Sequence, residues 1–427
     1  MILRSILSAL FLAATALPIQ AIAASAVFIH PDGTGLGHWN AARVKFAGPD
    51  GQLNWDRMER LAAYRVHQKN FLSTTSHAGA TVHAYGKKVH YNSFGLDRDQ
   101  PLVAASGEPM SLMHEAMKAG KRVGIVNSGH VGEPGTAVFL ASNESRRNVN
   151  EIAVGVMESG ADLIFVGGEI FLLPAGLEGH HGEPGVRQDG RNLIDEARER
   201  GYTVIFTRQE LLELHPQTEK VIGIFAAVNT YNDMSEEALA ERELQTYNPD
   251  QPAFDEMVTK ALEILSADSA RDFFLVAEEE GSDNFSNKMN GKGMLDAMGR
   301  ADRAIGATLD FIEAQPRRPT LLLVGSDSDA GNPTIWAPRE PAQDYELSTQ
   351  TGSGAALDGI NGSGGTPFMS QPDQFGNQHA FGIAWATSED QQGATVAKAH
   401  GHGSERLPVN FDNTGIYRML HSVLFED

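Results

Sequence analysis

Short apolar runs that end at a carboxylate occur three times along this chain, and the acids are Asp32, Glu278 and Asp327. Such runs, with β-branched residues inside them and glycines just beyond, are typical of buried parallel strands. The carboxyl ends of parallel strands line one crevice of an open α/β sheet. We therefore expect the three acids to lie close together at one edge of a sheet.

Helix and strand patterns alternate through most of the chain. The predicted helices are residues 109–119, 149–158, 192–200 and 293–314, and the predicted strands are residues 122–127, 162–166 and 203–206. This alternation predicts an α/β fold with a mostly parallel central sheet and helices on both of its faces. No internal repeat or boundary divides the chain, so residues 24–427 are expected to form a single domain.

Residues 332–378 break this pattern, because they are rich in Gly, Ser, Pro and Gln. A loop of this length inside a compact domain is either functional or disordered. We interpret the segment as a glycine-rich insertion over the mouth of the crevice. The sequence leaves open whether it is a lid, a dimer contact or a disordered loop.

The N-terminus has the pattern of a secretory signal. Arg4 precedes an apolar stretch over residues 6–17, and residues 21–23 offer a small-x-small cleavage site. The alternative is a membrane anchor, but the stretch is shorter than the roughly 20 residues that a spanning helix needs. We expect cleavage before Ala24, a periplasmic or secreted protein, and no membrane contact after cleavage.

The composition narrows the possible partners and chemistry. Hydrophobic residues make up 41% of the 427 residues and charged residues 21%, which is ordinary for a globular protein. The net charge of −21 argues against binding to nucleic acid or to anionic membranes. The chain has no cysteine, which excludes both cysteine-ligated zinc and a cysteine nucleophile.

Acids gathered in one crevice repel one another unless cations lie between them, so a metal site is the leading interpretation. Each acid taken alone could instead cap a helix or form a turn. Asp283 and Asn287 are four residues apart, so in a helix they would share one face and could bind one cation. Glu279 and Glu280 are expected to be turn or surface acids.

A hydroxyl-rich segment, residues 73–81, supplies the candidate nucleophile. A serine at a helix N-terminus lies beside free backbone N–H groups and the positive end of the helix dipole, which favours attack on phosphorus. From this segment alone, a plain helix cap is the favoured role for Ser76. The neighbouring His77 is a surface residue, a metal ligand or a base, and the first of these is favoured. His402 lies in a glycine-rich turn of the kind that often supplies metal ligands, with His400 as a bystander.

Taken together and in this order, the segments of the chain resemble the alkaline phosphatase family. The resemblance covers nearly the whole mature chain and rests on residues 32–35, 75–81, 84–88, 91–95, 190–194, 273–278 and 402–409. It implies a phosphomonoesterase that acts on small phosphate esters through a phosphoserine, binds divalent metal ions, with magnesium and zinc as the expected ions, and forms a homodimer.

The resemblance also implies roles for individual residues. These are Ser76 as nucleophile, Asp32 as a carboxylate shared between metals, Thr136 and Glu278 as ligands of an auxiliary metal, Asp283 and His402 as ligands of a first metal, Asp327 as a ligand of a second metal, and Arg146 as the phosphate clamp, with Arg147 as the alternative. Two cations about 4 Å apart suit in-line displacement at phosphorus, and a planar guanidinium suits bidentate phosphate binding.

The chain departs from the family pattern at several of these positions. Asn287 and Ser328 stand where the family has zinc-binding histidines, Thr75 replaces an aspartate, and Pro134 stands where an aspartate or histidine would support the third metal. Oxygen donors suit magnesium, calcium or manganese, whereas imidazole nitrogen favours zinc. With Asn287 and Ser328 as metal ligands, we expect weaker zinc binding or an altered metal preference.

Three functions remain open at this point. The first is a secreted metal-dependent phosphomonoesterase, and the second is a phosphodiesterase or sulfatase on the same scaffold. The absence of cysteine argues against sulfatases that mature a cysteine. The third is a degenerate member of the family that binds metal or phosphate without turnover.

Overall fold

The computed structural model describes residues 24–338, 345–391 and 393–426. The predicted signal segment, residues 1–23, lies outside the described residues. Within the described part of the chain, no helix is both long and apolar enough to span a membrane.

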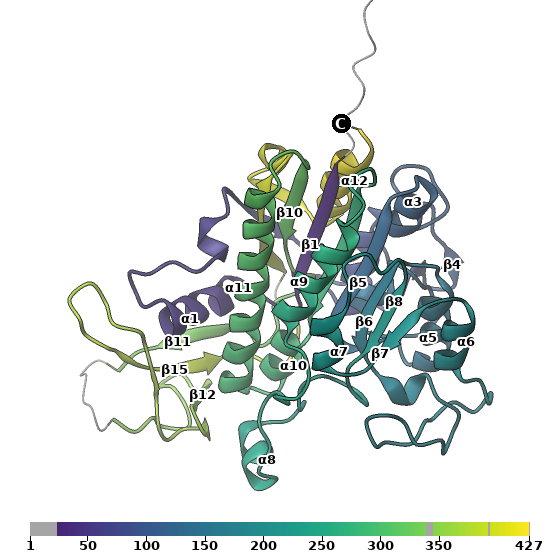
Figure 1. The fold of residues 1–427 in the computed structure, drawn as a ribbon. Helices are drawn as coiled ribbons and strands as arrows, with labels where there is room; N and C mark the ends of the chain where they lie inside the picture. Colours follow the sequence, from purple (N-terminus) through teal and green to yellow (C-terminus); the bar gives the residue numbers. More distant parts are fainter. Residues whose placement is uncertain (1–23, 339–344, 392, 427) are drawn as a thin grey trace, which may run out of the picture.

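A ten-stranded sheet forms the centre of the molecule (Figure 1), in the order β17-β2-β16-β10-β1-β9-β5-β6-β8-β7. The strands are β1 (Ser25–Pro31), β2 (Arg60–Arg65), β5 (Arg122–His130), β6 (Leu163–Gly167), β7 (Thr203–Ile205), β8 (Val221–Ile224), β9 (Phe273–Glu279), β10 (Thr320–Val324), β16 (Ala394–Gly401) and β17 (Asn410–Asp412). Every neighbouring pair from β10 to β7 is parallel, whereas β16 is antiparallel to both of its neighbours. The predicted mostly parallel sheet is confirmed.

Helices cover both faces of this sheet and create two separate cores. Neighbouring side chains of a strand point to opposite faces, so Phe28 enters one core and Val27 the other. The first core also holds residues of α2 (Ser76–Tyr85), α3 (Leu112–Lys118), α5 (Val149–Glu158), α6 (Leu193–Glu199) and α12 (Thr414–Phe425). The second holds residues of α1 (Leu36–Phe46), α7 (Arg208–Glu213), α9 (Phe254–Leu265), α10 (Gly281–Asn287) and α11 (Gly291–Ala314). The molecule is thus a three-layer α/β structure.

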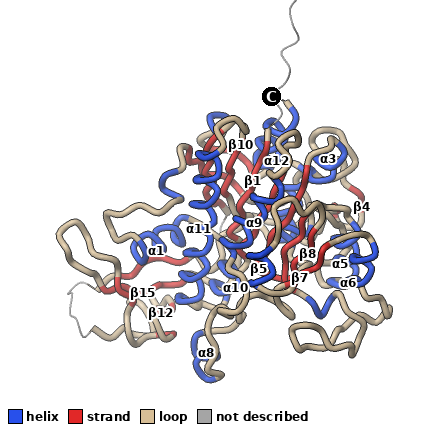
Figure 2. Tube along the Cα trace, viewed as in Figure 1, coloured by secondary structure: helices blue, strands red, loops and turns tan. Residues whose placement is uncertain are grey.

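The segment predicted as a glycine-rich loop contains short strands. They are β11 (Pro333–Trp336), β12 (Ala356–Gly359), β13 (Gly362–Ser363) and β14 (Phe368–Met369), and they join β15 (Ala380–Trp385) in a second, antiparallel sheet. Figure 2 shows this sheet beside the main one. The backbone N–H of Gly291 donates to Asp358 Oδ2 at 2.7 Å, which ties the small sheet to the start of α11.

The remaining elements are short connections. They are β3 (Leu96–Asp97), β4 (Gln100–Pro101), α4 (Pro134–Ala137), α8 (Glu236–Glu241) and the 3₁₀ turns Trp55–Arg57, Glu169–Phe171 and Ser404–Arg406. Among them, α4 matters for the site, because its first turn lies at the carboxyl edge of the sheet beside β9.

Candidate metal centre

The three acids that follow apolar runs meet at one edge of the sheet. Strand β1 lies between β10 and β9, so the carboxyl ends of the three strands are adjacent. Asp32, Glu278 and Asp327 are fully buried. Each of the three retains a carboxylate oxygen without a hydrogen-bond partner. The structure therefore brings together the acids that the apolar runs pointed to.

Helix α10, which begins just after β9, adds further ligand candidates. Asp283 and Asn287 share one face of it, and Asn287 Nδ2 donates to Asp283 Oδ2 at 2.9 Å. One carboxylate oxygen from each of Asp32, Glu280 and Asp283 lies within 4.8 Å of the others, a grouping that could hold a metal ion. Glu280, expected at a turn or on the surface, is only 2% exposed, and that expectation is corrected.

Glu279 is also buried rather than at the surface. Its Oε1 accepts hydrogen bonds from Tyr247 Oη at 2.7 Å and from Ser128 Oγ at 2.8 Å. Side chains alternate along β9, so Glu279 points away from Glu278 and into the opposite core. Glu279 therefore lies on the opposite side of β9 and belongs to neither of the residue groups that could hold a metal ion.

The structure does not bring His402 to the metal centre, which corrects its expected role. The backbone N–H of His402 donates to Thr320 O, at the start of β10, whereas Asp327 follows the end of that strand. The whole of β10, which spans about 13 Å at roughly 3.3 Å per residue, lies between these positions. Because β16 is antiparallel to β10, the residues before β16 lie at the metal edge, and those after it do not.

Asp390 lies in the segment before β16, at the metal edge of the sheet, where His402 had been expected to supply a ligand. Asn287 Nδ2 donates to Asp390 Oδ1 at 3.3 Å. Burial, followed by repulsion from Asp327, raises the pKa of Asp390 to about 6. Ser328 is buried beside Asp327, with its Oγ 3.4 Å from Asp327 Oδ1. A charge pattern alone would not have singled out Asp390 among the many acids of this chain.

Thr136 and Glu278 form a second part of the site. The Thr136 hydroxyl lies 3.4 Å from Glu278 Oε2 and accepts a hydrogen bond from Asn127 Nδ2 at 2.8 Å. Asn127 also donates to Glu278 Oε2. His30, the last but one residue of β1, joins Asp32 and Glu278 in a second grouping that could hold a metal. His30 was not among the ligands expected from the sequence, because it lies within an apolar run.

Ser76 is the first residue of α2, and this helix reaches the carboxylates through Gly79. Thr75 caps the helix, its hydroxyl accepting from the Ala78 backbone N–H at 3.4 Å. A Cβ on Gly79, one turn along, would lie 2.5 Å from Asp327 Cβ. The first turn of α2 therefore packs directly against Asp327. His77 is 8% exposed, not a surface residue as favoured, and burial together with the charge of Arg146 lowers its pKa to about 3.

Arg146 is the arginine that reaches the carboxylates. Its Nη2 lies 3.7 Å from Glu133 Oε2, and its side chain is 42% exposed. Partial burial opposes its charge, but Glu133, Glu280 and other acids of the site hold its pKa above the usual value. Glu133 is also 2.9 Å from His130 Nε2 and directly precedes Pro134. Glu133 thus supplies a carboxylate next to Pro134, which stands where the family has an aspartate or histidine.

Without a counterion, several acids of this centre are hard to ionise, whereas hydrogen bonds hold the pKa of Asp327 below its usual range despite its burial. Burial, followed by the neighbouring carboxylates, raises the pKa of Asp32, Glu280 and Asp283 well above the usual range. Burial raises the pKa of Glu278 to about 7. Buried, unpartnered carboxylate oxygens at this density fit divalent cations, which supply the missing positive charge.

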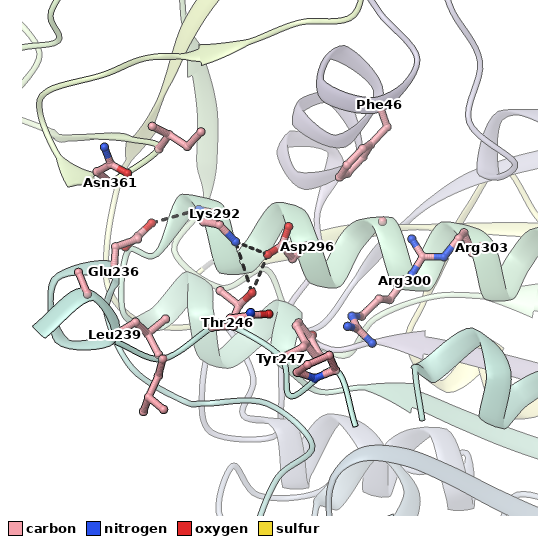
Figure 3. A pocket seen from close by; sticks show the side chains of 16 residues that line it. Phe46, Glu236, Leu239, Thr246, Tyr247, Lys292, Asp296, Arg300, Arg303 and Asn361 are labelled. Carbon is pink, nitrogen blue, oxygen red and sulfur yellow. Dashed lines mark hydrogen bonds and ion pairs between the residues drawn. The ribbon is translucent and has the colours of Figure 1, made fainter. Parts of the chain in front are cut away.

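A separate cavity of about 690 Å³ lies on the other side of Glu279. Figure 3 shows Lys292, Asp296 and Thr246 joined by polar contacts on one side of it, with Arg300 on the same helix. It adjoins the site through Tyr247, which lines the cavity and donates to Glu279. Its lining contains none of the grouped carboxylates, so it is not the metal centre.

A three-layer α/β scaffold with buried carboxylates at its strand ends, beside a serine at a helix N-terminus, defines a class of metal-binding proteins. The sequence profile of the family described as "Alkaline phosphatase" matches residues 26–335. The chain belongs to the alkaline phosphatase family. This family uses divalent metal ions, in agreement with the carboxylate groups described above.

Several characterised proteins are similar to this chain. Alkaline phosphatase 4 of Bacillus subtilis is 27% identical over 264 residues, which are 62% of this chain and 51% of that protein. The alkaline phosphatase of Gadus morhua is 26% identical over 64% of this chain and 63% of its own length. Streptomycin-6-phosphate phosphatase of Streptomyces griseus is 25% identical over 71% of this chain and 73% of its own length. The chain thus spans between half and two thirds of the first two relatives.

Solved structures share the fold. The alkaline phosphatase of the Antarctic bacterium TAB5 has a TM-score of 0.70 at 18% identity, covering 94% of this chain and 98% of its own. The alkaline phosphatase of Thermus thermophilus has a TM-score of 0.71 at 19% identity, and the match covers 98% of this chain and 96% of its own. The overall fold of the chain is therefore that of known alkaline phosphatases.

Proposed function

We propose that this protein is a metal-dependent phosphomonoesterase that uses Ser76 as its nucleophile. One observation carries the proposal: the first turn of α2, which starts at Ser76, packs against Asp327 within a buried group of carboxylates that fits divalent cations. Membership of the alkaline phosphatase family supports the same activity.

The reaction divides into two displacements at phosphorus. Ser76 Oγ forms a bond to phosphorus, the P–O ester bond breaks, and the departing alcohol oxygen leaves with the electron pair and takes up a proton. Water then attacks the phosphoserine, releasing inorganic phosphate and restoring the serine hydroxyl. Divalent cations, when bound, favour ionisation of the attacking oxygen and neutralise charge on the leaving oxygen.

The chain's own groups orient and stabilise the phosphoryl group. The free N–H groups at the start of α2 favour negative charge near Ser76. Arg146 is partly exposed and faces the carboxylates, so its guanidinium can bind two phosphate oxygens at once. His77, neutral at working pH and buried beside the serine, can donate or accept a hydrogen bond there.

The proposed metal preference follows from the donor atoms around Asp283 and Asp327. Asn287 offers an amide oxygen, Ser328 a hydroxyl, and Asp390 a carboxylate. Oxygen donors suit magnesium, manganese or calcium better than zinc. A small phosphate ester is the proposed substrate class, and export through residues 1–23 and a homodimer remain predictions.

The decisive experiment uses mature protein dialysed against a chelator. A chromogenic phosphomonoester and a phosphodiester are each assayed during separate titrations with magnesium, manganese, calcium and zinc. We expect monoester hydrolysis restored by magnesium or manganese, abolished by Ser76→Ala and unchanged by Ser348→Ala, which alters an exposed serine. Activity on the diester alone would replace the proposed function with a diesterase, and metal binding without turnover would identify a degenerate member.

The metal preference has its own test. The double variant Asn287→His with Ser328→His restores nitrogen donors at two positions. We expect its zinc affinity to rise by at least about 10-fold relative to magnesium. An unchanged preference would contradict the explanation from donor atoms while leaving the phosphatase proposal intact.

A further inference from the structure

His30 is an imidazole buried in the centre of the carboxylate group. It is fully buried in the middle of the sheet. Its Nε2 lies 3.2 Å from Asp327 Oδ1 and 3.5 Å from Asp32 Oδ1, and its Nδ1 lies 3.8 Å from Glu278 Oε1. The register of β1 and β9 sets His30 directly opposite Glu278.

His30 Nδ1 and Glu278 Oε1, which face each other across this gap, have no hydrogen-bond partners. His30 Nδ1, Glu278 Oε1 and Asp32 Oδ2 are buried and make no hydrogen bond. At 3.8 Å, Nδ1 and Oε1 are too far apart to bond directly. Buried polar groups are almost always satisfied, so unpartnered atoms that converge point to a missing ligand.

The gap is open because residue 135 is glycine. A Cβ at Gly135 would lie 2.6 Å from His30 Nδ1 and would also collide with Glu278 Oε1. The Thr136 hydroxyl, next along the chain, lies beside the second oxygen of Glu278. The space beside Gly135 is thus lined by His30 Nδ1 on one side and by oxygens of Glu278 and Thr136 on the other.

We propose that His30 Nδ1 is a nitrogen ligand of the auxiliary metal, together with Glu278, Asp32 and Thr136. This inference rests on the metal centre of the proposed function and adds a ligand that the family resemblance does not supply. The nitrogen gives the auxiliary site an affinity for borderline ions such as zinc or cobalt, while the sites around Asp283 and Asp327 keep oxygen donors.

The second nitrogen of the ring is placed to support this role. Histidines that bind metals usually donate their other ring N–H to a carboxylate or carbonyl. With the proton on Nε2, the acceptor is Asp327 Oδ1. Without metal, Nε2 can instead accept the Asp327 backbone N–H at 3.0 Å, so metal binding selects one tautomer of His30. His30 also links the auxiliary site to a ligand of the neighbouring site.

The test is proton NMR of the chelator-dialysed mature protein, titrated with Co²⁺. A histidine bound to Co²⁺ through one nitrogen gives a strongly shifted, exchangeable N–H signal from the other. We expect such a signal in the unaltered protein and its loss in His30→Gln, with at least about 10-fold weaker binding of one cobalt ion. The control is His83→Gln, because His83 is equally buried and its ring centroid is 5.7 Å from that of His30.

A second variant keeps the test decisive if His30→Gln does not fold. Gly135→Ala leaves the imidazole in place and fills the gap, so it should remove the same signal. A signal that survives either His30→Gln or Gly135→Ala, or that disappears in His83→Gln, would overturn the assignment. Phosphatase activity without the signal would overturn the assignment alone, whereas the signal without phosphatase activity would support it and count against the proposed function.

Discussion

The carboxylates of the metal centre should make the metal-free protein less stable as the pH rises. Glu278 shows the effect most simply, because burial raises its pKa from the ordinary 4.5 to about 7. Between these values the folded chain binds more protons than the unfolded chain. The free energy of unfolding must then fall with increasing pH, with the loss complete above the folded pKa.

The size of the effect follows from the two pKa values. For Glu278 alone, the free energy of unfolding should fall by roughly 2–3 kcal/mol between pH 5 and pH 8. Asp390, whose pKa rises to about 6 through burial and the charge of Asp327, acts in the same direction. These acids lie close together, so their contributions are not independent and need not add.

Urea unfolding of chelator-dialysed protein at pH 5, 6, 7 and 8, followed by tryptophan fluorescence, measures this loss. Glu278→Gln removes the titrating group and should flatten the pH dependence by the amount assigned to Glu278. Saturating magnesium should remove the decline, because the cation stabilises the ionised acids. A metal-free protein whose stability stays level or increases between pH 5 and pH 8 would refute the account of the buried acids.

Three other predictions concern single positions. Asp390→His should raise zinc affinity by about 10-fold relative to magnesium in a competition with a metal-binding dye, and an unchanged ratio would exclude Asp390 as a ligand. Arg146→Ala should raise KM for a phosphomonoester at least about 10-fold, from the loss of a charge-assisted hydrogen bond, whereas Arg147→Ala should not, and equal effects would contradict the assignment. Gly79→Ala should displace α2 from Asp327, lower kcat at least about 100-fold and destabilise the fold by about 1–3 kcal/mol. Gly352→Ala, where a Cβ meets nothing within 4 Å, is its control, and similar effects of the two would contradict the packing argument.

The parts of the fold that the sequence predicted well depend on local pattern. The helix expected at residues 293–314 is α11 (Gly291–Ala314), and the helix expected at 149–158 is α5 (Val149–Glu158). Both are long amphipathic segments, in which apolar residues recur at helical spacing. The strands that lead to Asp32 and Glu278 are short and mostly apolar, and the first carboxylate after each apolar run marked where the run ends.

The weaker predictions depended on relations between distant segments. The segment expected as a glycine-rich loop contributes strands to a second sheet, because its pairing with β15 (Ala380–Trp385) joins residues far apart in sequence. His402 and Asp390 flank one strand, and only the antiparallel direction of β16 (Ala394–Gly401) decides which of them lies near Asp327. Spacing along the chain carries no information on that direction.

His30 illustrates a different limit of the sequence. A histidine inside an apolar strand has the pattern of a core residue, and only its position opposite Glu278 gives it polar partners. Glu280 was misplaced for the same reason. It follows two other acids, and nothing local distinguishes the acid that turns inward from one that faces solvent.

By itself, the sequence determined the α/β class, the strands whose ends carry acids, and the serine at the start of a helix, because each depends on a few neighbouring residues and their periodicity. The tertiary structure alone decided which of the many acids and histidines share a site. Strand order, strand direction and helix docking bring groups together from positions hundreds of residues apart, and buried charge at those positions is stable only when the converging groups compensate one another.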